Sequence, residues 1–321
     1  MSARLRGIAK ETEEIVRTGG YRTEDGRDVR IRTAVDAAVA GTRMYGPEPV
    51  ALASATDRAT APSRDRATGT APDGGGATGP AARVPVIEVT GESSLEAARR
   101  LTGAGSGPVA VLNFSSARNP GGGYLNGAQA QEEALCRASA LYTTLLRVPE
   151  FYAHHRADRS PFYTDRVIHS PGVPVFRDDR GRLLDTPYRV GFLTSPAPNA
   201  GVIARDTPAE VHRVPAALAG RAERVLETAA ERGYRRLVLG AWGCGVFRND
   251  PDQVAHVFRA LLTGGGRFAY HFDETVFAVL DRTSDGTTVG AFRRVFADRT
   301  AADGSAAAVP LSALSASRTA P

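Results

Sequence analysis

The sequence predicts an α/β fold in which one layered sheet carries helices on both faces. Short apolar runs typical of buried strands alternate along the chain with longer segments whose apolar residues recur every three or four positions, as on a helix face. Two glycine-rich loops each come after an apolar run that is expected to form a strand. Because ligands bind at the carboxyl ends of strands in such sheets, both loops are expected at one ligand-binding edge.

The N-terminal third is expected to supply two helices and two strands. A partial apolar stripe predicts an amphipathic helix at residues 4–18 that packs on the main domain. Residues 29–39 mix charge with β-branched side chains, which predicts a short strand there. The run VPVIEV predicts a strand at residues 84–89, and a helix is expected at residues 94–101.

The middle of the chain centres on a strand followed by a helix. Residues 109–112 are wholly apolar, which predicts a buried strand. The helix that follows is expected to begin at Gln131 and to continue through an apolar face formed by Leu135, Ala138, Tyr142 and Leu145. Further strands are predicted at residues 167–170 and 188–194.

The last third repeats the alternation. A long helix is predicted at residues 211–232, with one face formed by Leu218, Ala222, Val225, Leu226 and Ala229. The apolar run at 237–239 predicts a buried strand that enters the second glycine loop. A helix at 251–262 and a strand at 275–280 complete the expected order.

Composition divides the 321 residues into four parts. Residues 1–49 are expected to form a helical extension packed on the core. Residues 50–82 are rich in Ala, Thr, Pro and Gly and contain no aromatic residue, so a disordered insertion is predicted there. Residues 83–299 are expected to form the catalytic domain, and the Ala/Ser-rich residues 300–321 a disordered tail.

Charge and cysteine content exclude several classes of protein. The formal net charge of +5 comes from arginine spread along the chain, so specific nucleic-acid binding is not expected. Cys136 and Cys244 are too few for a disulfide framework, which favours free thiols and a cytoplasmic location. The six histidines lack metal-ligand spacing, and the N-terminus has no apolar run long enough for a signal peptide or membrane span. Neither a metal nor a cofactor is therefore expected.

The first glycine loop is followed by a helix that begins with two acids. The loop reads Asn119-Pro120-Gly121-Gly122-Gly123, and the helix opens with Gln131-Glu132-Glu133. Glycine lets the loop adopt positive φ and lets a ligand approach its backbone N–H groups. Such N–H groups near a helix N-terminus suit an anion such as a diphosphate.

The two adjacent glutamates have different expected roles. Neighbouring helical residues point about 100° apart, so Glu132 and Glu133 cannot flank one bond as the opposed acid and base of an ordinary glycosidase. One carboxylate is better placed at the reacting centre and the other on the sugar. The alternative is a glycine turn followed by acids that merely favour the helix N-terminus.

The second glycine loop, Gly243-Cys244-Gly245-Val246-Phe247, is expected to form the other half of the cleft. Its N–H groups suit a phosphate, and Phe247 suits a contact with a sugar or base. The alternative is a tight turn between strand and helix with Phe247 in the core.

These stretches resemble the microbial-type poly(ADP-ribose) glycohydrolases, which are built on a macrodomain. The resemblance rests on N-P-G-G-G, seven intervening residues and Q-E-E, together with the sequence flanking each motif. A second stretch, LGAWGCGVFRNDP at residues 239–251, and the N-terminal RGIAKETEEIVRTGGY at residues 6–21 are also similar to this family. The resemblance implies a three-layer α/β/α macrodomain-like fold with a mixed sheet and an N-terminal helical extension.

The resemblance also implies residue roles. Glu133 would be the general acid and base for the ribose–ribose bond, and Glu132 would hold ribose hydroxyls. Gln131 would order the loop and Asn119 would bind the distal ribose. The remaining contacts to diphosphate and ribose would come from Gly121, Gly122, Gly123, Gly243, Cys244, Gly245, Val246 and Phe247.

Three functions compete at this point. The first is hydrolysis of poly(ADP-ribose) from the chain end to release ADP-ribose, by a monomer with no membrane partner. The second is removal of mono-ADP-ribose from protein or nucleic acid. The third is a non-catalytic ADP-ribose-binding macrodomain, which an intact Gln131-Glu132-Glu133 motif argues against, because binding alone requires no acid there.

Overall fold

The computed structural model describes residues 2–52, 85–105 and 107–300. The predicted disordered segments at 50–82 and 300–321 lie outside these residues except for 50–52 and 300. No helix in the described part of the chain is both long and apolar enough to cross a membrane.

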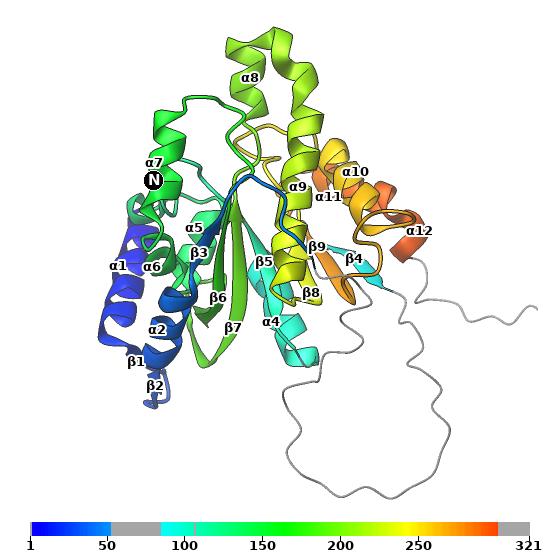
Figure 1. Ribbon diagram of the computed structural model, residues 1–321. Coiled ribbons are helices and arrows are strands. Elements are labelled where there is room, and N and C mark those ends of the chain that lie inside the picture. The colour runs from blue at the N-terminus through cyan, green and yellow to red at the C-terminus, as the bar shows by residue number, and fades with distance from the viewer. Residues whose placement is uncertain (1, 53–84, 106, 301–321) are drawn as a thin grey trace, which may run out of the picture.

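A seven-stranded sheet forms the centre of the fold, in the order β3-β6-β7-β5-β8-β9-β4 (Figure 1). The five strands from β7 to β4 are parallel, whereas β6 pairs antiparallel with both β7 and β3, so the predicted mixed sheet is confirmed. The sheet strands are β3 (Arg43–Tyr45), β4 (Val86–Thr90), β5 (Val109–Phe114), β6 (Val167–Arg177), β7 (Leu183–Ser195), β8 (Arg236–Leu239) and β9 (Glu274–Ala278). A separate hairpin pairs β1 (Gly20–Arg22) with β2 (Asp28–Arg30).

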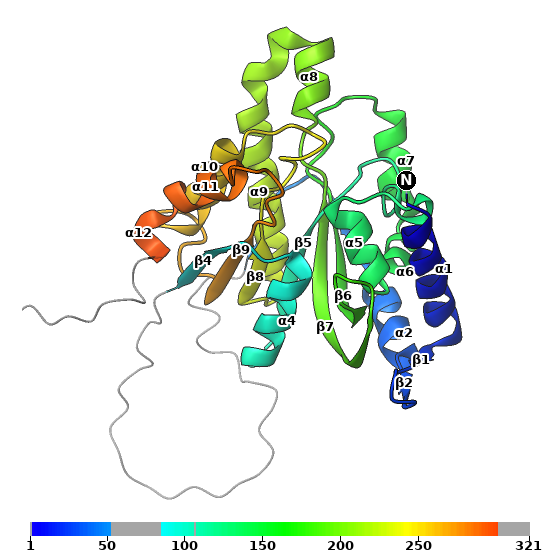
Figure 2. The ribbon, with the colours of Figure 1, turned by 180° about the vertical axis from the view of Figure 1, so that it is seen from behind.

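Helices cover both faces of the sheet, which confirms the three-layer α/β/α prediction (Figures 1 and 2). One layer contains α1 (Ala3–Thr18), α2 (Arg32–Gly41), α4 (Ser94–Ala104), α5 (Gln131–Ala138), α6 (Leu141–Leu145) and α7 (Pro149–Ala157). The other contains α8 (Ala200–Asp206), α9 (Val214–Glu231), α10 (Pro251–Leu262) and α11 (Thr287–Val295). Short 3₁₀ turns occur at η1 (Tyr124–Asn126) and η2 (Pro208–Arg213), and α12 is Ala297–Thr300.

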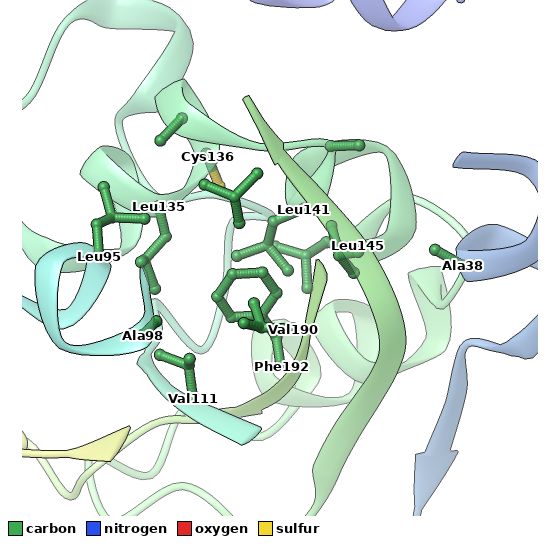
Figure 3. Packing of buried hydrophobic residues seen from close by; sticks show 14 of the residues in the cluster. Ala38, Leu95, Ala98, Val111, Leu135, Cys136, Leu141, Leu145, Val190 and Phe192 are labelled. Atoms are coloured by element: carbon green, nitrogen blue, oxygen red, sulfur yellow. The ribbon is translucent and has the colours of Figure 1, made fainter. Parts of the chain in front are cut away.

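Each layer buries its own apolar cluster against the sheet. Figure 3 shows part of the first cluster, in which Leu135 of α5 and Leu141 of α6 face Phe192 of β7. All three side chains are fully buried, and the burial of each one stabilises the fold by roughly 2 kcal/mol. The helices that carry the candidate site are thereby fixed to the sheet.

The prediction of one continuous helix from Gln131 is wrong, because the helix is interrupted between α5 and α6. The hydroxyl of Ser139 accepts the N–H of Leu141 at 3.2 Å and donates to the carbonyl of Leu135 at 2.7 Å. The N–H of Ala140 donates to the carbonyl of Pro174 in β6. The backbone is therefore held by the neighbouring strand, which the helical apolar spacing did not reveal.

Several other elements differ from the sequence prediction. Residues 29–39 contain the end of a strand but are mainly helix α2, in keeping with their alanine content. The helix expected from residue 211 begins at Val214, after a 3₁₀ turn. The helices α7, α8 and α11 were not predicted.

The helix α1 lies against the loop that precedes α5. Its N-cap residue Ser2 donates its N–H to the carbonyl of Gly127 at 3.2 Å. The hydroxyl of Tyr124 lies 2.9 Å from Oε1 of Glu13 and 3.2 Å from the carbonyl of Ala9. The N-terminal helix therefore braces the first glycine loop.

Candidate active site

The two glycine loops leave adjacent parallel strands. β5 and β8 are neighbours in the sheet, with Val111 opposite Val238. The first loop follows β5 and the second follows β8, so both lie at the carboxyl edge of the sheet, as predicted (Figure 1).

Glu132 is buried beneath the first loop. Its Oε2 accepts the N–H of Ser116 at 2.7 Å, and its Oε1 accepts the side-chain amide of Asn113 at 3.2 Å. Burial is the main cause that raises the pKa of Glu132 to about 8, and the neighbouring Glu133 adds to the shift. Glu132 is therefore largely protonated at neutral pH.

Glu133 occupies the third position of α5 and binds the loop with both carboxylate oxygens. Oε1 accepts the N–H of Gly123 at 2.8 Å, and Oε2 accepts the N–H of Ala130 at 3.0 Å. The second bond is the helix-start contact that the alternative interpretation predicts. The first bond is not part of a helix start, because it connects the Glu133 carboxyl group to the glycine loop.

The glycines allow the loop to close on the two acids. Gly121 and Gly122 have φ values of +64° and +57°, a conformation that side chains disfavour. A β-carbon on Gly121 would lie 2.9 Å from the ring of Tyr142. A β-carbon on Gly122 would lie within 3.3 Å of carboxylate atoms of both Glu132 and Glu133. Glycine is therefore required by the backbone conformation and by the space available.

Gln131 joins the start of α5 to β5. Its amide oxygen accepts the N–H of Phe114 at 2.9 Å, and its amide nitrogen donates to the carbonyl of Leu112 at 2.8 Å. The same nitrogen lies 3.1 Å from the hydroxyl of Ser94. These bonds connect Gln131 to β5 and to the start of α4, and the loop-ordering role of Gln131 stays a prediction.

Asn119 lies at the exposed rim of the first loop. Its N–H donates to the hydroxyl of Ser116, and its carbonyl accepts the N–H of Gly122 at 3.0 Å. The backbone of Asn119 is thus fixed while its side chain faces solvent, as a ligand-binding amide would.

The second loop turns sharply at Gly243, where φ is +72° and a β-carbon would lie 2.5 Å from Ala197. Gly245 and Val246 are exposed, with 82% of Val246 accessible. Phe247 is half-buried, and its ring centroid lies 5.9 Å from that of Tyr163. Phe247 therefore combines a partial core contact with an accessible face. Cys244 is half-buried, and burial raises the pKa of its thiol to about 12.

A cavity of about 650 Å³ opens beside these loops. Of the predicted site residues, Gln131, Cys244 and Gly245 line it, whereas Glu132, Glu133 and the three consecutive glycines do not. Other lining residues include Ser93, Ser94, Phe114, Val279, Leu280 and Asp281. The cavity thus extends from the second loop and the end of β9, past the starts of α4 and α5, to α1 and the turn between β6 and β7.

Three residues at the site were not among those predicted from sequence. Asn113 is buried at the end of the apolar run of β5 and contacts both Glu132 and Thr194. A polar residue directly after four apolar residues was the available signal. No sequence pattern distinguishes Ser116 from its neighbours. Tyr163 is distant from Phe247 in the sequence, so the contact between these two rings depends on the fold.

No group of His, Cys, Asp and Glu residues with the arrangement of a metal site occurs in the described residues. The groups that bind the carboxyl oxygens of the two glutamates include three backbone N–H groups and the side-chain amide of Asn113.

Comparison with known proteins identifies the relatives of this chain. The family described as "Microbial-type PARG, catalytic domain" matches residues 9–178. The poly(ADP-ribose) glycohydrolase of Thermomonospora curvata is 50% identical, with a TM-score of 0.80 over 92% of this chain and 100% of the other. The same enzyme bound to the inhibitor ADP-HPD gives 48% identity and a TM-score of 0.78 over 91% and 99%. The Deinococcus radiodurans enzyme in complex with ADP-ribose is 41% identical, with a TM-score of 0.70 over 85% of this chain and 100% of the other. No curated protein matches the chain.

Proposed function

Because the chain belongs to the family of microbial-type poly(ADP-ribose) glycohydrolases, we propose that this glycohydrolase cleaves the ribose–ribose bond with Glu133 as its general acid. The observation that carries the assignment is the contact of Glu133 with the N–H of Gly123 in the glycine loop. That contact holds a carboxyl group beside the loop that is expected to cradle the terminal ADP-ribose unit.

In the first step, Glu133 donates its proton to the 2′-oxygen of the departing ribose. The glycosidic bond breaks with both electrons passing to that oxygen, and an oxocarbenium-like centre forms at the anomeric carbon of the retained ribose. Glu133 is left as a carboxylate, and the N–H groups of Gly123 and Ala130 stabilise its charge.

In the second step, a water molecule adds to the anomeric carbon. The Glu133 carboxylate accepts a proton from this water, which regenerates the acid and yields free ADP-ribose. The reaction consumes one water for each bond and requires no other reactant.

Glu132 has a supporting role in this proposal. Its raised pKa keeps it largely neutral at pH 7, so a second full negative charge does not build up beside Glu133. A neutral carboxyl can both donate to and accept from ribose hydroxyls. The N–H groups of the first glycine loop already bind the two glutamates and Asn119, so the second loop supplies N–H groups for the diphosphate.

Cleavage from the chain terminus is part of the proposal. The cavity of about 650 Å³ is within the range of sites that hold one ligand of nucleotide size. We further infer a cytoplasmic monomer. The two free cysteines support the cytoplasmic location, because disulfides are rare in that compartment.

The test compares wild type with Glu133→Gln for release of ADP-ribose from purified poly(ADP-ribose) and for binding of ADP-ribose. Glu150→Gln is the matched control, because Glu150 is an exposed acid in the first turn of α7. Loss of release by at least roughly a hundredfold with retained binding, and a normal control, is expected. Binding without release by the wild type would refute the proposed activity, and undiminished release by Glu133→Gln would refute the role of Glu133.

A further inference from the structure

A second hollow, separate from the cavity described above, is lined by four arginines. Its volume is about 390 Å³, and we call it the arginine pocket, formed by Arg118, Arg156, Arg159 and Arg205. The remaining lining residues are Pro161, Tyr163, Asn199, Val202 and Asp206. Arg118 directly precedes the first loop, Arg156 lies near the end of α7, Arg159 follows α7, and Arg205 belongs to α8. α7 and α8 both rise beyond the carboxyl ends of the central strands (Figures 1 and 2).

The charge in this pocket is mostly uncompensated. Among the described ion pairs, Arg205 binds Asp206 at 2.6 Å, but Arg118, Arg156 and Arg159 take part in none. Asp206 is the single acid among the lining residues. Three guanidinium groups therefore carry positive charge without a described carboxylate partner, which is the arrangement expected of an anion site.

The pocket is held in place by its own hydrogen bonds. Arg118 donates to the carbonyls of His155 at 3.3 Å and Arg159 at 3.0 Å. Arg156 donates in turn to the carbonyl of Arg118 at 2.7 Å. The Arg118 guanidinium also lies 6.0 Å from the ring centroid of Tyr163. These contacts fix the backbone, and they leave the exposed Arg159 side chain free to meet a ligand.

Two connections link the arginine pocket to the active site. Arg118 directly precedes Asn119, which is expected to bind the distal ribose. Tyr163 lines the pocket and also contacts Phe247 of the second loop. The arginine pocket therefore lies beside Asn119 and Phe247 and is lined by none of the residues that line the cavity at Cys244 and Gly245.

We propose that the arginine pocket binds the diphosphate of the ADP-ribose unit that adjoins the scissile bond on the leaving-group side. This inference rests on the proposed function, in which the first glycine loop holds the terminal unit beside Glu133. The leaving 2′-oxygen belongs to that next unit, whose diphosphate must lie outside the terminal-unit site. Guanidinium groups bind phosphate oxygens in a bidentate manner, so arginine suits this position better than lysine.

The experiment measures binding in the Glu133→Gln background, so that the polymer is not consumed. Arg159→Glu and Arg205→Glu are each compared with Arg293→Glu, a matched control in which an exposed arginine of α11 makes no described ion pair. The probes are purified poly(ADP-ribose) and monomeric ADP-ribose, at low and at physiological salt. The melting temperature of each variant is measured to verify folding.

Arg159→Glu is expected to weaken polymer binding about tenfold while ADP-ribose binding stays unchanged. The loss should shrink at high salt, and the control should alter neither affinity. Unchanged polymer affinity in both pocket variants would overturn the proposal. An equal loss for ADP-ribose would also overturn it, because the pocket would then serve the terminal unit. Since binding is measured without turnover, failure of the proposed activity would be detected separately, by absence of ADP-ribose release from the wild type.

Discussion

Gly122 lies so close to Glu133 that a β-carbon on the glycine would be 2.6 Å from Oε1 of the acid. The same β-carbon would be 3.2 Å from Oε2 of Glu132. A side chain at the middle glycine of the loop would thus meet both carboxyl groups. The positions of the two carboxyl groups therefore depend on the conformation of the loop.

Gly122→Ala is expected to lower kcat by about a hundredfold or more, because the methyl group must displace the Glu133 carboxyl by several tenths of an ångström. The positive φ of +57° adds a backbone cost of roughly 1–2 kcal/mol. Steady-state kinetics on poly(ADP-ribose) and a thermal melt measure the two effects.

Gly7→Ala is the control for Gly122→Ala. Gly7 lies within α1, and a β-carbon at this position would have no neighbouring atom within 4 Å. Alanine there should stabilise the helix by about 0.5–1 kcal/mol and leave kcat unchanged. Wild-type kcat in Gly122→Ala would show that the loop can yield without moving the acid.

Glu132→Gln is expected to change how stability depends on pH. The folded-state pKa of Glu132 is raised from 4.5 to about 8, so between these values the folded chain holds a proton that the unfolded chain releases. Rising pH therefore favours unfolding, by about 1.4 kcal/mol per pH unit for this group. Glu132→Gln has no carboxyl group at this position and does not lose this stability. The melting temperature of the variant minus that of wild type should therefore increase from about pH 5 to about pH 8.

The comparison uses melting temperatures of both proteins across that range. Asp178→Asn is a suitable control, since burial alone would raise the pKa of the Asp178 carboxyl but hydrogen bonds from Arg182 outweigh it and lower that pKa. Its melting temperature relative to wild type should not rise over the same interval. A constant difference between Glu132→Gln and wild type would mean that Glu132 is ionised in the folded protein throughout.

The elements that carry the candidate site could be predicted from local sequence. The run at residues 109–112 identified β5, and Gln131 was correctly placed at the start of a helix. The adjacency of the two glycine loops followed from a general rule, since the carboxyl ends of parallel strands share one edge. Each of these elements is thus encoded within a few consecutive residues, and the sheet topology brings the two loops together.

Other features depend on contacts between distant segments. The break between α5 and α6 requires β6, because the N–H of Ala140 bonds to Pro174. The contact of Tyr163 with Phe247 joins residues that lie far apart in the sequence, and the arginine pocket gathers three separate segments. Spacing within one segment carries no information about such pairings.

Tyr124→Phe tests whether α1 positions the active-site loop. The tyrosine hydroxyl is buried beside Glu13, whose pKa is raised by burial, and the variant leaves that carboxyl without this donor. We expect a loss of roughly 1–3 kcal/mol in the free energy of unfolding and a several-fold fall in kcat, with little change in ADP-ribose affinity. Tyr270→Phe is the control, because 75% of Tyr270 is exposed. Wild-type kcat in Tyr124→Phe would show that the loop keeps its position without this contact.

Gln131 offers a test of how the strand holds the helix that carries Glu133. Its amide accepts from Phe114 and donates to Leu112, so it continues the hydrogen bonding of β5 with a side chain. Gln131→Glu keeps the acceptor but places a second oxygen against the Leu112 carbonyl, which should cost roughly 1–3 kcal/mol in the free energy of unfolding. Gln129→Glu is the control, because Gln129 is exposed and its substitution adds the same charge two residues earlier. A thermal melt compares stability, and kinetics compares kcat, which should fall in Gln131→Glu as α5 shifts against β5. Equal stability of the two variants would mean that the helix is held by its apolar face alone.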